Sequence, residues 1–281
     1  MDTLFHYTTA TGLLGILQSL SLWASDLRFL TDAHEAIFAR DLVVEAVRNM
    51  KNPMEDPTHW AHEQHGDLAV RTFSKYQGFV VDEILASEFG VYVACFCESG
   101  DLLSQWRGYG MDHGYAVELS ADALREALAR IPTYPDATGL FQVRYGYDAA
   151  DSVVESALQV VAGFNLNHPG VKAHYSALAV SSMLAQLKHP GFAEEHEWRA
   201  VVGLEIYDES WGVGDREPTS FRSTPRAIVP YVELPLELGA ITSIRVGPGE
   251  NADVREAGVR RLLKALGSNA TVTRSEVPLR T

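Results

Sequence analysis

The sequence has few cysteines and no long apolar run. Its 281 residues include two cysteines, Cys95 and Cys97, and nowhere approach the roughly 18 consecutive apolar residues that suggest a membrane span. The cysteines lie two positions apart on one predicted strand, where side chains at i and i+2 cannot form an unstrained disulfide. We therefore expect reduced thiols in a cytoplasmic protein. The first residues include Asp2 and no basic segment, which argues against a secretory signal peptide.

Basic residues are also scarce. The chain has 23 Lys and Arg against 37 Asp and Glu, a net charge of −14. A protein that binds nucleic acid without sequence preference needs a basic surface, so this composition disfavours that class. Residues 201–281, with 10 basic and 11 acidic groups, are the closest to neutral. A nucleic-acid target is therefore expected to contact a local patch in this last third.

The apolar residues, 46% of the chain, follow the periods of strands and helices. The pattern predicts strands over residues 4–8, 21–25, 91–97, 115–119, 141–147, 198–204, 228–234, 241–246 and 271–277. It predicts helices after Thr9 or Thr11 and over residues 33–50, 67–89, 121–130, 149–164, 172–186 and 253–266. No repeat or linker interrupts the chain. The sequence thus predicts one α+β domain over residues 1–281, with a helical insertion around residues 33–89.

A polar group, His6-Tyr7-Thr8, lies on the first predicted strand. Side chains alternate along a strand, so His6 and Thr8 share one face and Tyr7 lies on the other. A histidine in this position either satisfies a structural hydrogen bond or faces a ligand. Both interpretations remain open at this point.

A second polar group follows the apolar strand over residues 91–97. Residues 104–107, Ser-Gln-Trp-Arg, read as a short helix, and Tyr109 follows them. The indole of Trp106 and the guanidinium of Arg107 offer stacking and positive charge to a planar or phosphorylated ligand. Trp106 suits a hydrophobic core equally well, because aromatic side chains dominate cores.

Two further patterns give weaker evidence for a functional site. The glycines of the next loop, Gly108, Gly110 and Gly114, match neither a P-loop nor a dinucleotide fingerprint, so turn geometry explains them. His59, His62 and His65 have a regular spacing, yet no acidic or thiol partner completes a tetrahedral site. We expect no metal.

The third polar group surrounds Glu197. If Trp198 and Ala200 pack on one face of their strand, Glu197 and Arg199 share the other. The pair is then either a surface ion pair or a catalytic acid held by its neighbour.

Several segments together resemble the DUF2971 family. They are FHYTTATGLLGILQSLSLWASDLRFLTD, VACFCESGDLLSQWRGYG with GYAVEL after it, HPGFAEEHEWRAVV and IRVGPG. The family pattern reads HYT, an apolar helix and sd..fLND..E, then CFS…lsqW..Ya..h.G, K…W..E.EyR and i.iG. This chain departs from it at Thr31, where asparagine is usual, and at Ala33-His34-Glu35, which replaces Pro-x-Glu. These departures affect a local turn more than the fold.

The opening segment is also similar to ADP-ribosyltransferases of the DarT-like and tRNA 2'-phosphotransferase-like groups. This resemblance implies a mixed, mainly antiparallel sheet core of ADP-ribosyltransferase type with helical insertions. In those folds a first-strand polar residue holds the NAD ribose, and an aromatic or second-strand group packs on nicotinamide. A late glutamate binds the hydroxyl of the nicotinamide ribose. Here the resemblance implies Glu197 as the catalytic residue and NAD contacts from His6, Thr8, Trp106, Arg107, Tyr109 and Arg199.

Three hypotheses follow. The first is an NAD-dependent ADP-ribosyltransferase, a bacterial toxin or anti-phage effector that modifies a nucleic acid or protein and is held by an antitoxin or regulatory partner. The second is a non-catalytic nucleotide-binding sensor of the same fold. The third is a metal-dependent hydrolase that uses the histidines near His59. The transferase hypothesis requires His6, Trp106 and Glu197 to line one cleft.

Overall fold

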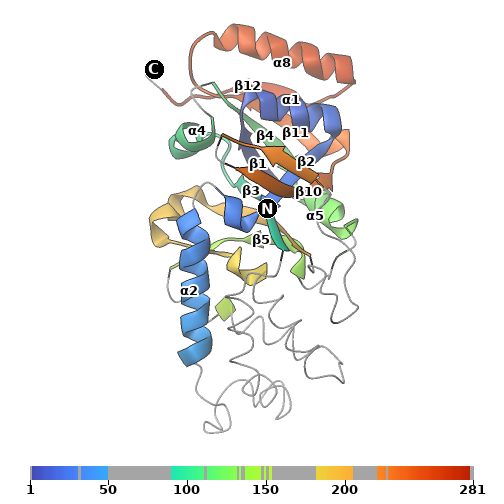
Figure 1. Cartoon of the computed structure of the whole chain (residues 1–281). Coiled ribbons are helices and arrows are strands. Elements are labelled where there is room, and N and C mark those ends of the chain that lie inside the picture. The colour runs from blue at the N-terminus through green and yellow to red at the C-terminus, as the bar shows by residue number, and fades with distance from the viewer. Residues whose placement is uncertain are drawn as a thin grey trace.

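The computed structural model describes residues 2–30, 33–49, 90–110, 113–131, 133, 137–146, 149, 152–153, 182–204, 220–225 and 227–278. Figure 1 shows their arrangement. The strands are β1 (Thr3–Thr8), β2 (Ser21–Asp26), β3 (Gly90–Cys97), β4 (Tyr115–Ser120), β5 (Gly139–Gln142), β6 (Arg144–Tyr145), β7 (Leu187–Lys188), β8 (Glu197–Leu204), β9 (Ser220–Ser223), β10 (Ile228–Pro235), β11 (Ile241–Val246) and β12 (Thr271–Arg274). The helices are α1 (Ala10–Ser19), α2 (Ala33–Asn49), α4 (Leu103–Tyr109), α5 (Ala121–Ala129) and α8 (Ala252–Leu266), with short 3-10 turns η1 (Leu27–Phe29), η3 (Pro190–Glu195) and η4 (Leu238–Ala240).

Ten strands form one sheet, with eight in the order β12-β11-β4-β1-β3-β2-β10-β9 and β8 and β5 branching from β3. Within this sheet β11 and β12 run parallel, and the other described pairs are antiparallel. The prediction of an α+β fold on a mixed, mainly antiparallel sheet is therefore confirmed.

The sheet divides at β3. One edge of β3 pairs with β8 along its whole length, from Gly90 opposite Leu204 to Cys97 opposite Glu197. The other edge is shared between two strands, because Tyr92 and Val93 pair with β2 whereas Cys97 pairs with β1. Residues 94–96 have no strand partner on this edge in the described part of the chain. The strands β1 and β2 thus separate on either side of a gap, which we call the fork.

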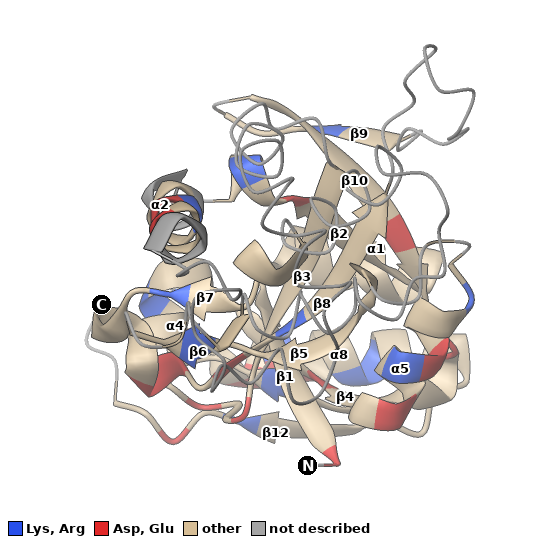
Figure 2. Cartoon of the chain, turned by 90° about the horizontal axis from the view of Figure 1, so that it is seen from below, with Lys and Arg blue, Asp and Glu red and all other residues tan. Residues whose placement is uncertain are grey.

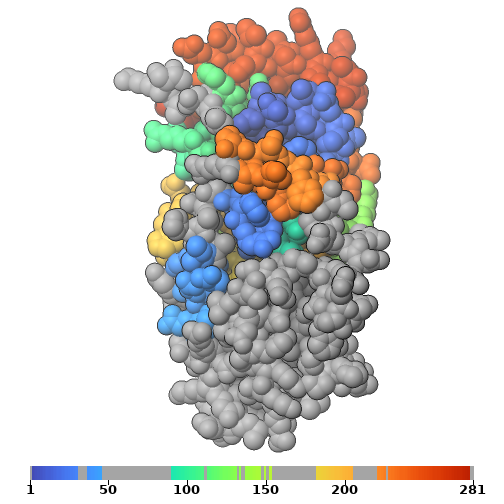
Figure 3. All heavy atoms as spheres, viewed as in Figure 1, coloured from blue at the N-terminus to red at the C-terminus, as the bar shows by residue number. Residues whose placement is uncertain are grey.

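Hydrophobic clusters cover both faces of the sheet. The largest lies on the face that α1, α5 and α8 cover, and it includes Leu17, Leu124 and Leu263. A second cluster lies under α2, where Val43 packs with Val93. Alternation along each strand therefore assigns its residues to the α1 face or to the opposite face. Figure 3 shows β9 and β10, in orange, at the surface beside the N-terminal segment in blue.

Most of the element predictions that fall on described residues are confirmed, and so are two of the expected caps. The hydroxyl of Thr9 accepts from the Gly12 amide at 3.2 Å, and Ser120 caps α5 in the same way. The prediction of one strand over residues 141–147 is wrong: β5 ends at Gln142, and β6 joins β7 in a separate parallel pair. The predicted helix over residues 67–89, much of the insertion around residues 33–89 and His59, His62 and His65 lie outside the described residues. The prediction of a single domain over residues 1–281 stays a prediction.

The described helices include none that is long and apolar enough to cross a membrane. Figure 2 shows acidic and basic residues side by side on α5, where Arg125 pairs with Asp122 at 2.8 Å. The charges of this helix therefore offset one another locally.

The glycine loop before β4 is packed without space for side chains. A Cβ atom on Gly114 would lie 2.3 Å from the Gly110 Cα and 2.9 Å from the Thr8 carbonyl oxygen. Gly247 donates its amide to the Gly114 carbonyl at 2.9 Å and closes this contact from β11. The glycines therefore serve close backbone packing, consistent with the structural interpretation of their spacing.

This packing predicts that Gly114→Ala destabilises the fold by about 1–3 kcal/mol, because an added methyl must displace backbone. Urea unfolding of the full chain measures the change. The matched control is Gly108→Ala in α4, where nothing lies within 4 Å of the added carbon. Equal unfolding midpoints for Gly114→Ala and Gly108→Ala would contradict the prediction.

Candidate functional site

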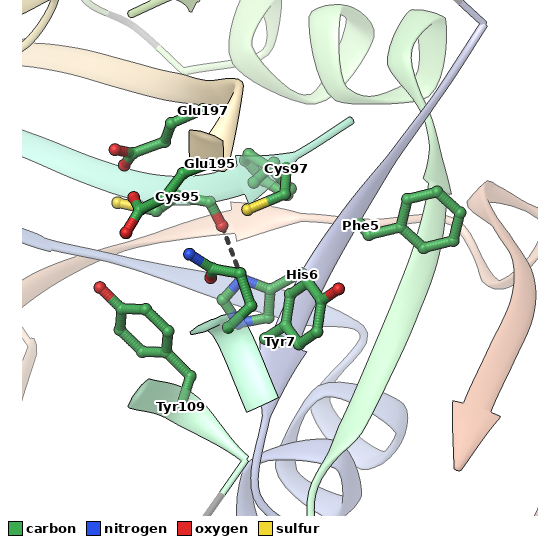
Figure 4. Close-up of a pocket in the computed structure, with 10 residues that line it drawn as sticks. Phe5, His6, Tyr7, Cys95, Cys97, Tyr109, Glu195 and Glu197 are labelled. Atoms are coloured by element: carbon green, nitrogen blue, oxygen red, sulfur yellow. Dashed lines mark hydrogen bonds between the residues drawn. The ribbon is translucent and has the colours of Figure 1, made fainter. Parts of the chain in front are cut away.

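A small pocket of about 60 Å³ opens at the fork. Four segments supply the side chains that line it: β1, β3, the helix α4 and the η3–β8 segment (Figure 4). Its lining residues are Phe5, His6, Tyr7, Cys95, Phe96, Cys97, Gln105, Tyr109, Glu195 and Glu197. Residues far apart in the sequence thus meet where the sheet divides.

His6 bridges the fork. Its Nδ1 lies 2.9 Å from the carbonyl oxygen of Cys95, and because a carbonyl only accepts, Nδ1 is the protonated nitrogen of the neutral ring. This bond replaces strand pairing that β3 lacks at this point. Burial lowers the pKa of His6, the Cys95 hydrogen bond partly offsets this effect, and the positive charge of Arg222 lowers the pKa further. The imidazole is therefore neutral at physiological pH, with Nε2 as an acceptor.

Glu197 lies in a buried ion network. Its Oε1 accepts from Nε of Arg199 at 2.8 Å, and its Oε2 accepts from Nζ of Lys188 at 2.8 Å and from Nη2 of Arg199 at 3.1 Å. Burial alone would raise the pKa of Glu197, but the charges and hydrogen bonds of Arg199 and Lys188 outweigh it and lower the pKa to about 2. The carboxylate is therefore ionised at neutral pH, and the interpretation as a surface ion pair is wrong.

Glu195 completes this network closer to the pocket opening. Nζ of Lys188 donates to Oε2 of Glu195 at 2.7 Å, so one ammonium group binds both carboxylates. The side chain of Glu195 is 12% exposed, against 4% for Glu197. His196, between them, has a left-handed backbone with φ of 42°, and this turn lets both glutamates face Lys188.

Tyr109 forms the opposite wall of the pocket. Its hydroxyl points toward the carboxylates of Glu195 and Glu197 (Figure 4), and its side chain is partly exposed. Burial first, and then the negative charge that Cys95, Glu197 and Glu195 can carry, raise the pKa of Tyr109, so its phenol is protonated. The ring thus combines an aromatic face with a hydrogen-bond donor.

The two cysteines are free thiols, as predicted, and both line the pocket. Burial raises the pKa of each thiol, and the neighbouring charge of Glu197 adds to the effect. A thiolate is the reactive form of cysteine, so both residues are weak nucleophiles at neutral pH. The carboxylates, the imidazole and the phenol are the groups left to act on a ligand.

Four of the residues implicated by the sequence do not line the pocket. Trp106 is 2% exposed, packs edge-on against Tyr7 and donates its indole N–H to Asp101 at 2.8 Å, so it belongs to the core. Arg107 is exposed on the outer side of α4. Thr8 faces α1, where its hydroxyl fills the space beside Gly12. Arg199 lies beneath Glu197 and also donates to the Ala185 carbonyl. His6, Tyr109 and Glu197 do line it. The expectation that His6, Trp106 and Glu197 line one cleft is therefore met by His6 and Glu197 and is wrong for Trp106.

Sequence reasoning gave no site role to Lys188 or Glu195, whereas Gln105 belongs to the second polar group that the sequence singled out. Parallel pairing of β7 with β6 places Lys188 beside the glutamates, and Tyr145 of β6 accepts the Glu197 amide at 2.8 Å. The signal was present in the family pattern K…W..E.EyR, whose charged positions correspond to Lys188, Glu195, Glu197 and Arg199. The structure brings these four charges together.

Residues 105–200 match the model of a protein family described as "Protein of unknown function (DUF2971)". The sequence resemblance to DUF2971 is thereby supported. The matched region contains Gln105, Tyr109, Glu195 and Glu197, whereas His6 and Cys95 lie before it. A search of curated proteins and a search of solved structures found no match.

The ion network predicts an acid-dependent stability. The folded-state pKa of Glu197, about 2, lies below its ordinary value of 4.5, so its contribution is complete above pH 4.5 and is lost as the pH falls toward 2. Glu197→Gln leaves buried cations uncompensated and should lower the free energy of unfolding by roughly 3–5 kcal/mol at pH 7. Denaturant unfolding at pH 7, 5, 4 and 3 should show this difference shrinking with acid. A pH-independent difference, or an equal loss in the exposed control Glu194→Gln, would contradict the prediction.

Proposed function

We propose that the protein is an NAD-dependent ADP-ribosyltransferase whose substrate NAD enters the pocket at the fork. The observation that carries this proposal is the meeting of His6 of the first strand, the aromatic Tyr109 and the late pair Glu195 and Glu197 around one pocket. His6, Tyr109 and Glu197 are among the residues that the ADP-ribosyltransferase resemblance implies, whereas Glu195 is added by the geometry. The sheet core of ADP-ribosyltransferase type is part of the same proposal.

The chemistry suits an ionised carboxylate. As the bond between nicotinamide and the ribose C1' breaks, nicotinamide leaves with the electron pair and positive charge develops on the sugar ring. A carboxylate that accepts a hydrogen bond from a ribose hydroxyl stabilises this oxocarbenium-like centre. A hydroxyl or amine of the target then attacks C1' and releases its proton to solvent.

The geometry changes which of the two glutamates is assigned the contact with the ribose hydroxyl. Glu197 has both oxygens engaged by Arg199 and Lys188, whereas Glu195 has more of its side chain open to the pocket. We therefore assign the hydroxyl contact to Glu195 and the charge that supports it to Glu197. His6 contacts the ribose as an acceptor through Nε2, and Tyr109 packs on the nicotinamide ring. Because the pocket is small, about 60 Å³, the proposal places only the nicotinamide end of NAD inside it.

A second candidate is a nucleotide-binding sensor without turnover. The salt bridges of Glu197 with Arg199 and Lys188 favour it, because a carboxylate already held by two cations is less available to a substrate.

For the enzyme, we propose that the target is a nucleic acid or a protein. We propose further that the enzyme acts in the cytoplasm as a toxin or anti-phage effector and is restrained by an antitoxin or regulatory partner.

Glu195→Gln tests the enzyme. Lys188 still binds Glu197 in this variant, so the fold should be preserved, while release of nicotinamide from NAD should fall by at least ~100-fold, the scale seen when one transition-state contact is removed. Chromatography of NAD and nicotinamide after incubation with cell lysate, with a partner or infection signal supplied, measures this loss. The matched control, Glu194→Gln, changes an exposed neighbouring acid and should retain activity.

Three results would count against the enzyme. Wild-type protein that neither consumes NAD nor modifies a lysate component would overturn it. Binding of NAD by calorimetry without consumption would establish the sensor instead. Equal turnover by Glu195→Gln and wild type, with unchanged melting temperatures, would remove Glu195 from the mechanism.

A second pair of variants tests the role of Tyr109. Tyr109→Phe keeps the ring and should retain most of the NAD affinity, whereas Tyr109→Ala should lose roughly tenfold or more, because stacking on one ring contributes about 1–3 kcal/mol. Calorimetric titration with NAD measures both. Equal affinities for the two variants would show that the ring does not stack on the ligand.

A further inference from the structure

Arg222 is a positively charged side chain with no acidic partner among the described residues, and it lies on the face of the sheet opposite α1. On β2, Leu22 and Ala24 join the α1-face cluster, so Ser25 points to the opposite face. Arg222 of β9 reaches across β10 and donates from Nη2 to the Ser25 hydroxyl at 2.9 Å. Arg222 is the basic residue that Figure 2 marks on β9.

The hydrogen-bonding capacity of Arg222 is largely unused. Its Nε is buried and has no hydrogen-bond partner, and no ion pair of the described residues involves its guanidinium. The neighbouring carboxylate of Asp26 is already bound by Arg28, whose Nη2 donates to Oδ2 at 2.6 Å and whose Nε donates to Oδ1 at 3.0 Å. It therefore does not compensate the charge of Arg222. Burial lowers the pKa of Arg222, yet a guanidinium stays protonated in proteins. A half-buried cation of this kind suits an anion that binds from outside.

The register of the strands places this cation near the pocket. Ser25 pairs with Val93 of β3, and Cys95 follows two residues later on the same face. Diagonal neighbours in such a ladder lie about 7–8 Å apart. Arg222 is also close enough to His6 for its charge to influence that imidazole. Arg222 and the pocket are therefore close enough for one nucleotide ligand to contact both.

An exposed aromatic stack lies beside Ser25. Trp23, two residues earlier on β2, stacks on Tyr231 of β10 with ring centroids 4.5 Å apart and planes at 26°. Its indole is 43% exposed. A planar base could pack on this ring while its phosphates reach the guanidinium. This arrangement favours a nucleotide over a simple inorganic anion.

We propose that Arg222 and Ser25 form a phosphate site, and that it binds the pyrophosphate of the dinucleotide whose nicotinamide end enters the pocket at the fork. The proposal rests on the proposed function for the identity of the ligand. It assigns a binding role to β9 and β2, which the sequence reasoning did not do. The guanidinium donates Nε–H and Nη–H groups to phosphate oxygens, the planar geometry that arginine offers to phosphate.

Calorimetry on the full chain tests this site with three ligands: NAD, ADP and nicotinamide riboside, which has the pocket-binding end and no phosphate. Arg222→Gln should weaken NAD and ADP binding by at least ~10-fold, as expected for loss of one charge-assisted contact. Nicotinamide riboside should bind unchanged. Arg261→Gln, an exposed arginine on α8, is the matched control for net charge. Arg222→Lys keeps the positive charge, so its affinities for NAD and ADP should lie between those of wild type and Arg222→Gln. Melting temperatures verify that each variant is folded.

The outcomes separate this proposal from the function on which it rests. If Arg222→Gln binds and cleaves NAD like wild type, the phosphate site is overturned and the enzyme stands. If wild type binds NAD and ADP through Arg222 but does not consume NAD, the phosphate site stands and the enzyme fails. If no ligand binds to wild type, both are overturned. Equal weakening for nicotinamide riboside would also overturn the phosphate site, because it would reflect a general disturbance of the pocket.

Discussion

The buried charges of Lys188 and Arg199 are the constraint on which the site depends. A buried cation is tolerated only beside a carboxylate, and here two cations are matched by Glu195 and Glu197. This requirement fixes three parts of the chain relative to one another: the β6–β7 pair that carries Lys188, the turn at His196 and the first residues of β8. Replacing the network with apolar residues could stabilise the fold equally well. Stability alone therefore does not account for these charges, and their position beside the pocket is compatible with a role in binding.

The fork gives this charge network access to a ligand. A fully paired β3 would bury the Cys95 carbonyl in a ladder and leave no space beside it. Separation of β1 from β2 exposes that backbone, and His6 satisfies it with one hydrogen bond. The imidazole thus makes a structural hydrogen bond and also lines the pocket, so the two interpretations that the sequence left open are compatible. Asp101, which accepts from Trp106 and from Ser275, supports the α4 side of the same pocket.

Much of the fold was predictable because it follows local patterns, whereas the site depends on long-range packing. Alternation along β8 correctly put Glu197 and Arg199 on one face, since that rule needs only the strand assignment. The role of Trp106 was not predictable, because an indole after an apolar strand serves a core or a ligand equally well until its neighbours are known. Glu195 was overlooked because its orientation follows from the left-handed backbone of His196, which is uncommon for a residue with a side chain.

Glu195 and Glu197 differ in how available their carboxylates are to a ligand, and this difference follows from electrostatics rather than from position alone. A ligand that approaches Glu197 must compete with Arg199 and Lys188 for oxygens that already accept three hydrogen bonds. A ligand that approaches Glu195 finds a carboxylate whose charge is shared with Lys188 and whose surroundings are more open. Lys188 couples the two, because a ligand that draws Glu195 away strengthens the hold of Lys188 on Glu197. The network can thus release one carboxylate to a ligand without leaving either of these two buried cations unpaired.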